Sequence, residues 1–382
     1  MEAYTPIPLP AREAMTPAAR KMRDFYDQKP GAPLYQREFG YYCLDRWYQG
    51  GLPKDADLDE FFGYDKGGLF ALEGLGWCEA AFEPAFEEKV LQDLGDYELV
   101  QDYAGRSVLY FKGRRNGVMP EYKDHPVKDL ASFTGECLWR LDPKNPARLS
   151  RLKAALPAAR EAARRGDVIS QRLIGGYMYL RSLIGPEALL YAFYDDPELI
   201  HACMQAWFAL ADSVIALHQQ AVTLDEIFIA EDICYNHGPL ISPAMIREFL
   251  FPYYRQLLDN ARARQQDPTR RLHFQVDTDG FCDPVIPLYG ELGLSYMSPF
   301  EVAAGCDVVR TGQEYPDLLL LGGVDKRVLA QGKDAIDRMV DRIFPAMRLR
   351  GGYIPTCDHG VPEEVSLENY LHYRKRCLEF AQ

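Results

Sequence analysis

The chain has 382 residues, of which 47% are hydrophobic and 26% are charged, and its formal net charge is −13. This composition is typical of a globular protein of one large or two ordinary domains, and the acidic balance argues against nucleic acid as the main partner. No apolar run approaches the roughly 20 residues of a membrane helix, and no signal peptide is visible, so we expect a cytoplasmic protein without a membrane partner. The nine cysteines lack a Cys-x-x-Cys pair, which indicates free thiols.

The first part of the chain predicts an extension and then the start of a domain. Residues 1–30 are Pro-rich and end in an amphipathic helix over 17–28, and we assign the domain to residues 31–382. A buried strand is predicted at 33–40. The aromatic segment that contains Trp47 follows it, either as a packed turn or as part of a substrate mouth.

The next part predicts a hairpin and an excursion. Residues 98–104 and 107–112 flank Gly105 and predict a β-hairpin. Residues 113–146 are polar and contain several prolines. We interpret them as a long excursion or cover and not as a linker between domains.

From residue 147 onward, short apolar strands alternate with helices. The predicted strands are 168–174, 225–230, 272–276, 294–297, 317–322 and 353–354, and the predicted helices are 147–165, 186–194, 197–220, 242–264, 334–349 and 364–380. This alternation predicts an α/β fold with a parallel sheet covered by helices. The number of units favours a single-domain (β/α)8 TIM barrel, and the absence of a Gly-x-Gly-x-x-Gly motif or a P-loop disfavours a doubly wound sheet.

Chemically active side chains follow most of these strands. They are Glu231, Asp232, Asp277, Asp279, Glu301, Asp325, Cys357, Asp358 and His359. Because the carboxyl ends of barrel strands share one mouth, we expect these groups to converge on one site. Thiol, carboxylate and imidazole groups together serve either a soft or borderline metal ion or acid–base chemistry.

Several of these side chains have a structural interpretation beside the functional one. Asp277 and Asp279 share one face of a strand, so a cation or a retained proton is expected there, unless they form an Asx turn. Glu231 and Asp232 are adjacent, and we expect Glu231 to be the inward-pointing one. Cys357 is either a ligand or an inert buried thiol.

At these same residues the chain resembles the uroporphyrinogen decarboxylase superfamily of single-domain (β/α)8 enzymes. The resemblance is carried by residues 230–232, 238–243, 298–301, 322–326, 351–354 and 358–362. The Arg-Gln-Ala-Gly-Arg and Ser-Asp-Ile-Leu-like motifs of true uroporphyrinogen decarboxylases are not found, although His359 resembles the His of their Gly-His-Gly segment.

The resemblance is stronger to the corrinoid-linked methyltransferase branch. Those enzymes bind zinc through a His-x-Cys motif at one strand end and a Cys at the last. Cys357 matches the last Cys, whereas Asp277 and Asp279 occupy the His-x-Cys position. The N-terminal part, with Phe39-Gly40 and Arg46-Trp47, resembles a subgroup that is associated with demethylation of small methylated compounds.

The resemblance thus implies a methyltransferase that acts on a small O-, N- or S-methyl compound, with zinc as Lewis acid and a corrinoid carried by a partner protein. The predicted metal ligands are Cys357, Glu301, Asp277 and Asp279; the predicted catalytic residues are His359, Glu231, Asp232 and Asp358; the predicted substrate contacts are Arg37, Trp47, Tyr235, Tyr296 and Phe300. Two alternatives are a metal-independent decarboxylase or lyase of a small acid and a non-catalytic ligand-binding barrel. An arginine cluster in the mouth, with Arg37, Arg172 and Arg310 as candidates, favours the decarboxylase.

Overall fold

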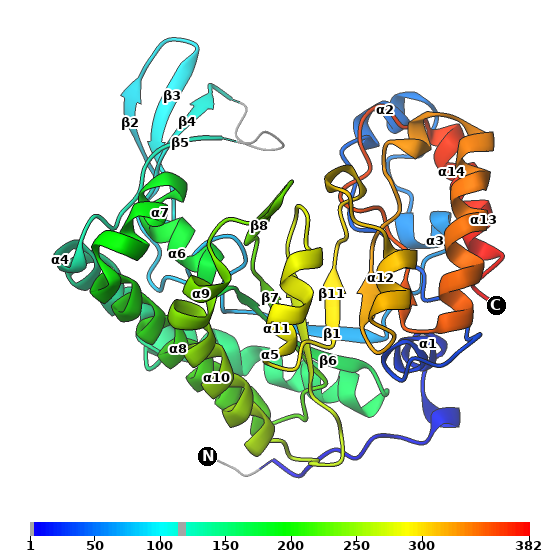
Figure 1. Ribbon diagram of the computed structural model, residues 1–382, viewed down its shortest axis with the longest axis horizontal. Coiled ribbons are helices and arrows are strands. Elements are labelled where there is room, and N and C mark those ends of the chain that lie inside the picture. Colours follow the sequence, from blue (N-terminus) through cyan, green and yellow to red (C-terminus); the bar gives the residue numbers. More distant parts are fainter. Residues whose placement is uncertain (1–3, 114–119) are drawn as a thin grey trace.

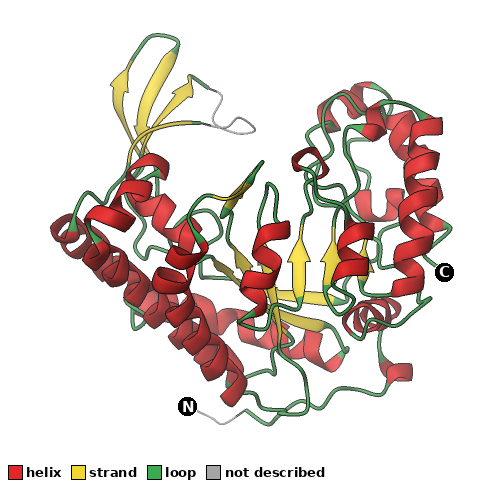
Figure 2. Cartoon of the chain, in the orientation of Figure 1, coloured by secondary structure: helices red, strands yellow, loops and turns green. Residues whose placement is uncertain are grey.

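The computed structural model describes residues 4–113 and 120–382. At its centre lies one curled sheet of parallel strands, with helices outside it on both flanks (Figures 1 and 2). The strands, in sheet order, are β1 (Leu69–Leu72), β6 (Val168–Ile174), β7 (Glu226–Ala230), β10 (His273–Asp277), β11 (Tyr296–Ser298), β12 (Leu319–Leu321) and β13 (Tyr353–Ile354). The predicted α/β class and the parallel sheet are confirmed.

The helices begin and end close to the predicted positions. The longer ones are α1 (Pro17–Tyr26), α5 (Pro146–Arg164), α6 (Gly176–Ile184), α7 (Pro186–Asp195), α8 (Pro197–Gln219), α10 (Phe251–Ala263), α13 (Lys333–Arg350) and α14 (Leu367–Leu378). The shorter ones are α2 (Leu44–Gln49), α3 (Leu58–Phe62), α4 (Leu130–Ser132), α9 (Pro243–Met245), α11 (Ile286–Gly290) and α12 (Val308–Glu314). The predicted helix 242–264 is interrupted by a π-helical turn at Ile246–Leu250, next to Pro252, which cannot donate a hydrogen bond to the preceding turn.

The predicted closed barrel is confirmed only in part, because the sheet is an open half-barrel. Seven strands are paired, and within the described residues no strand pairing joins β13 to β1. The segment 33–40, predicted as a strand, lacks strand pairing. Its backbone groups bond elsewhere: Leu34 N donates to Phe380 O (2.9 Å), Gln36 N to the Asp65 carboxylate (2.7 Å), and Val361 N donates to Gly40 O (2.8 Å).

A second, antiparallel sheet projects away from the parallel one (upper left in Figure 1). Its strands are β2 (Lys89–Asp93), β3 (Tyr97–Gln101), β4 (Ser107–Phe111) and β5 (Glu121–Asp124). The pairing of β3 with β4 confirms the predicted hairpin, and Gly105 in the turn has a φ of +80°, which favours glycine. Of the predicted excursion 113–146, residues 114–119 lie outside the described residues, and the rest forms β5, α4 and short turns.

Helix α8 has 23 residues, and an 18-residue stretch of it has a mean hydropathy of 1.4, so its length and apolar content are those of a membrane span. However, 56% of its most apolar stretch is buried inside the protein, where the helix packs against α6, α7 and α10. Its apolar side chains therefore serve the core beside the sheet.

The inner face of the curled sheet, which we call the lumen, is polar. The side chains of β10 alternate: Phe274 and Val276 join the core against the helices, whereas Gln275 and Asp277 line a cavity on the inner face. The same period of two places Arg172 of β6 inside. The strand pattern thus delivers charged groups to the lumen.

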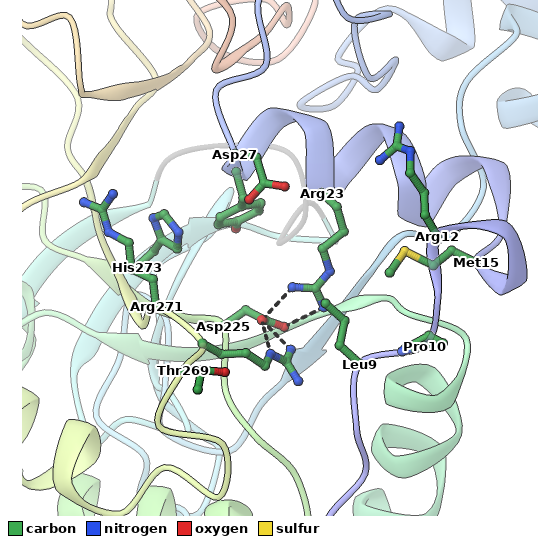
Figure 3. Close-up of a pocket in the computed structure, with 12 residues that line it drawn as sticks. Leu9, Pro10, Arg12, Met15, Arg23, Asp27, Asp225, Thr269, Arg271 and His273 are labelled. Atoms are coloured by element: carbon green, nitrogen blue, oxygen red, sulfur yellow. Dashed lines mark hydrogen bonds and ion pairs between the residues drawn. The ribbon is translucent and has the colours of Figure 1, made fainter.

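The amino-terminal helix is fixed beneath the sheet by buried ion pairs (Figure 3). Asp225, which directly precedes β7, accepts hydrogen bonds from both terminal nitrogens of Arg23 (2.6 and 3.0 Å) and from Arg270 Nε (3.1 Å). It also accepts one from Ile169 N (2.8 Å), and the two arginines hold the pKa of Asp225 below its ordinary value despite burial. Through Asp225, α1 is joined to two strands of the sheet.

We predict that Asp225→Ala lowers the free energy of unfolding by about 3–5 kcal/mol, because it leaves two guanidinium groups buried without their anion. Urea unfolding near neutral pH measures this change. Because the pKa of Asp225 is depressed on folding, its stabilisation is present above the pKa of the unfolded chain and is lost as pH falls through the folded value. The control Glu161→Ala removes an exposed ion pair with Arg164 and should cost less than about 1 kcal/mol; equal losses in both variants would contradict the prediction.

Candidate active site

A cavity of about 300 Å³ opens within the lumen. Its walls come from six of the parallel strands and from the segments that precede β1 and follow it. They are lined by Arg37, Phe39, Leu69, Trp77, Arg172, Glu226, Phe228, Gln275, Asp277, Tyr296, Ser298 and Leu321. Two of the predicted substrate contacts, Arg37 and Tyr296, and one predicted metal ligand, Asp277, thus share one cavity.

The cavity contains two arginines whose positive charges have few carboxylate partners. Arg172 lies 3.6 Å from the exposed carboxylate of Glu73, and its buried Nε has no hydrogen-bond partner. Its guanidinium lies over the stacked rings of Trp77 and Phe228, at 5.9 and 5.6 Å from their centroids. Arg37 makes no ion pair within residues 4–113 and 120–382. The charges of this pair suit an anionic ligand better than a neutral one.

Two carboxylic acids face these arginines. Burial raises the pKa of Asp277 to about 6, although the Ser298 hydroxyl donates to its carboxylate and the arginines oppose the shift. Ser298 in turn accepts a hydrogen bond from Gln275 Nε2 at 2.8 Å. Deeper in the lumen, Glu226 accepts hydrogen bonds from Ser170 (2.5 Å) and Tyr26, and burial raises its pKa as well.

Above the cavity lies a group of charged residues that we call the rim cluster: Asp232, Asp279, Glu301, Lys326 and His359. Burial, followed by the charges of Asp232, Asp277 and Glu301, raises the pKa of Asp279 to about 7. Glu301 accepts a hydrogen bond from Gly280 N at 2.9 Å, and its carboxylate lies 3.5 Å from Lys326 Nζ. Asp279 therefore keeps its proton close to neutral pH, whereas Glu301 has a cationic neighbour.

His359 is a neutral imidazole with a defined tautomer. Its Nδ1 accepts a hydrogen bond from Gly360 N (2.9 Å) and lies 3.3 Å from the Tyr42 hydroxyl, so its proton is on Nε2. Nε2 lies 3.9 Å from the Asp279 carboxylate. Burial and the charge of Lys326 lower the pKa of His359. The ring contacts that of Phe39 in a tilted arrangement, at 4.9 Å between centroids, and Phe39 also lines the cavity, so the rim cluster and the cavity adjoin.

Asp358, predicted as catalytic, lies fully buried beside the rim cluster. It accepts hydrogen bonds from Val302 N (2.8 Å) and Lys326 N (3.4 Å), and Lys326 Nζ lies 3.6 Å away. Burial raises its pKa. Its contacts join the loops that follow β11, β12 and β13, so Asp358 holds these loops in position relative to one another.

The expectation that Glu231 points into the mouth is wrong. Its carboxylate is fully buried and accepts hydrogen bonds from the hydroxyl groups of Tyr254 (2.6 Å) and Tyr289 (3.0 Å) on α10 and α11. Asp232 takes the inward position, with Arg181 at 3.9 Å and Asp279 N at 3.4 Å. Glu226 and Phe228 of β7 line the cavity, so the strand alternation puts Asp232 on the same side and Glu231 on the opposite side.

Three predicted substrate contacts lie outside the cavity lining. Trp47 is packed in the core and donates from Nε1 to Val365 O at 2.8 Å. Phe300 is also fully buried, with a φ of 59°. Tyr235 is exposed on β8 (Cys234–Tyr235), where its ring contacts that of His237. The aromatic rings that line the cavity are instead Phe39, Trp77, Phe228 and Tyr296.

The four predicted metal ligands do not converge. Cys357 is buried behind the cavity, where Glu38 contacts it and burial raises the pKa of its thiol well above the ordinary value. Among the described residues, the only group of three or more His, Cys, Asp or Glu ligand atoms within 4.8 Å of one another is formed by Cys282, Asp283 and Cys306. A zinc ion held by Cys357, Glu301, Asp277 and Asp279 therefore does not fit this arrangement.

Sequence reasoning missed Glu226, Gln275, Ser298 and the aromatic pair Trp77 and Phe228. A signal was present, because polar residues recur at every second position in His273–Asp277. Such alternation in a parallel strand marks the face that lines the lumen.

Comparisons with known proteins agree with this fold. The family model of uroporphyrinogen decarboxylase (URO-D) matches residues 115–379, more than half of the chain. The chain belongs to the uroporphyrinogen decarboxylase family. No curated protein matches the chain significantly.

Among solved structures, a methyltransferase from Methanosarcina mazei aligns with a TM-score of 0.60 and 13% identity over 96% of this chain and 99% of that one. A protein described as a vitamin-B12-independent methionine synthase from Listeria monocytogenes aligns with a TM-score of 0.33 and 15% identity, over 59% of this chain and 68% of that one. At these identities the first match shows a shared fold, and the second carries no argument. The family that matches this chain is one of enzymes, and the first alignment agrees with its fold.

We predict that the buried Glu231 makes the protein less stable as pH rises. Burial raises its pKa to about 7, so between about pH 4.5 and 7 the folded chain binds more protons than the unfolded chain. The free energy of unfolding therefore declines through this window, and Glu231→Gln should reduce the decline by on the order of 2 kcal/mol. Urea unfolding at about pH 5 and about pH 8 measures it. The exposed Glu161→Gln should leave the decline unchanged; an unchanged decline in Glu231→Gln would disprove the assignment.

Proposed function

We propose that this protein is a methyltransferase that removes a methyl group from a small anionic O-, N- or S-methyl compound by general acid catalysis. The observation that carries the proposal is the placement of Asp279, a carboxylic acid whose pKa is raised to about 7, beside a cavity that contains Arg37 and Arg172, of which only Arg172 has a carboxylate partner, the exposed Glu73, among the described residues. Because the predicted zinc ligands do not converge, the proposed reaction uses proton transfer by side chains.

Arg37 and Arg172 bind the anionic group of the substrate. Paired guanidinium groups recognise a carboxylate through charge-assisted hydrogen bonds, and Arg172 has a buried Nε without a partner. The stacked rings of Trp77 and Phe228 beside Arg172 offer an apolar surface for the rest of the molecule. The anionic group thus fixes the substrate with its methyl-bearing end towards the rim.

Asp279 supplies the proton that makes the heteroatom a better leaving group. The bond between the methyl carbon and the heteroatom breaks, its electron pair stays on the heteroatom, and that atom takes the Asp279 proton. The methyl group passes to the acceptor, which by the family resemblance is a corrinoid on a partner protein. His359 Nε2–H, 3.9 Å from the Asp279 carboxylate, stabilises the carboxylate that remains.

Decarboxylation is the second candidate, and the arginine pair favours it. Here the substrate carboxylate leaves as carbon dioxide, and the electron pair of the broken carbon–carbon bond takes the Asp279 proton. Arg310, the third arginine named for this alternative, is exposed and pairs with Asp283, so the cluster consists of Arg37 and Arg172.

We predict that the purified protein demethylates a methylated carboxylic acid in the presence of reduced cobalamin as methyl acceptor, and that Asp279→Asn lowers turnover by about 10²–10⁴-fold. Activity should fall as pH rises through about 7, because the acid form of Asp279 is lost there. A panel of methoxy, methylamino and methylthio acids, each beside its neutral amide, tests both parts of the proposal.

Arg37→Met and Arg172→Met should each raise KM by about 10–100-fold for the acids and much less for the amides, since each removes a charged hydrogen bond. Arg247→Met, which removes an exposed arginine of the outer helix layer, is the matched control and should leave the KM unchanged for both the acids and the amides. Carbon dioxide release without methyl transfer would establish the decarboxylase instead. Equal activity on acids and amides would contradict anion recognition by the arginines.

A further inference from the structure

Two cysteines meet behind the rim cluster. Cys282 follows β10, Cys306 follows β11, and both are buried. Their sulfur atoms are 3.6 Å apart. This distance is far longer than a disulfide bond of about 2.05 Å. It is close to the separation of about 3.8 Å that two thiolates have when they share a tetrahedral zinc ion with zinc–sulfur bonds of about 2.3 Å.

A carboxylate completes a set of three ligands. One ligand oxygen of Asp283 lies within 4.8 Å of both sulfur atoms. Asp283 Oδ2 pairs with Arg310, but its Oδ1 is buried and has no hydrogen-bond partner. A buried carboxylate oxygen without a donor is costly unless a cation or a water molecule satisfies it.

We propose that Cys282, Asp283 and Cys306 form a binding site for a divalent transition-metal ion of the zinc class. Two thiolates and one carboxylate are ligands that zinc accepts, and thiolates select against magnesium and calcium. The site is separate from Cys357, and it rests on none of the residues assigned to the reaction.

The ion would act as a clamp between two loops of the mouth. Cys282 follows Asp279 on the segment after β10, and Cys306 follows Glu301 on the segment after β11. An ion bound by both sulfurs would therefore join the turn that carries Asp279 to the loop that carries Glu301, next to the hydrogen bond from Gly280 N to Glu301 (2.9 Å). The positions of both rim residues then depend on the clamp.

Metal binding displaces the thiol protons to solvent, so the affinity should fall as pH falls.

The test is metal content, measured on the full chain purified without a chelator or a metal-binding tag and reconstituted with zinc. We expect about one zinc per chain, lost in Cys282→Ser and Cys306→Ser but retained in Cys357→Ala and in the buried control Cys203→Ser. Cobalt in place of zinc should give a thiolate-to-cobalt charge-transfer absorption that the two serine variants lack. Asp283→Asn, which keeps both thiols, should weaken zinc binding by about tenfold or more and guards against misfolding of the serine variants.

Three results would overturn the proposal: no metal in the reconstituted wild-type chain, a Cys282–Cys306 disulfide in mass spectra of the untreated protein, or a metal lost only in Cys357→Ala. None of these readouts depends on turnover, so the clamp and the proposed methyl transfer stand or fall separately.

Discussion

The cost of placing charge inside a sheet governs how this molecule is built. The lumen holds arginines and carboxylic acids that an ordinary core excludes, and each ionised group there needs a partner or a proton. At the base, Asp225 has two arginines and is ionised. At the rim, Asp279 is surrounded by other carboxylates and keeps its proton. The same constraint therefore gives a structural set of ion pairs around Asp225 at the base and a candidate acid, Asp279, at the rim.

The cavity and the rim cluster divide the work of the proposed site. The cavity offers positive charge and aromatic surface, which suit recognition. The rim cluster offers a protonated acid and a neutral imidazole of known tautomer, which suit proton transfer. Phe39 lines the cavity and contacts His359 of the rim cluster, so the two parts adjoin.

Much of the fold was predictable, because periodicity and capping are local. The strand at 168–174 and the helices at 186–194 and 197–220 were predicted to within a residue or two at each end. The open edge of the sheet was not predictable. Residues 33–40 form no strand because their backbone groups bond to Asp65 and Phe380, which are distant in the sequence. No local pattern reports such partners.

The site was predictable as a location and less so residue by residue. Strand ends indicated Asp277, which lines the cavity, and Asp279, which belongs to the rim cluster. Glu231 and Asp232 were exchanged because the inward face of β7 is the one that carries Glu226 and Phe228, and a strand-end pattern alone does not identify that face. Cys357 was assigned from the family resemblance, but it faces Glu38 and the core behind the cavity, which only the tertiary packing decides.

The open seam between β13 and β1 has a consequence for how the binding cavity comes into being. Arg37 lies on a segment that is held by backbone hydrogen bonds from Leu34 to Phe380 and from Val361 to Gly40, so one wall of the cavity joins residues more than 300 positions apart. During synthesis on the ribosome, the early residues must wait for the late ones before this wall exists. The parallel strands can pair sooner, but a competent pocket is among the last features to form. Any partner that recognises the finished mouth thereby discriminates mature chains from nascent ones.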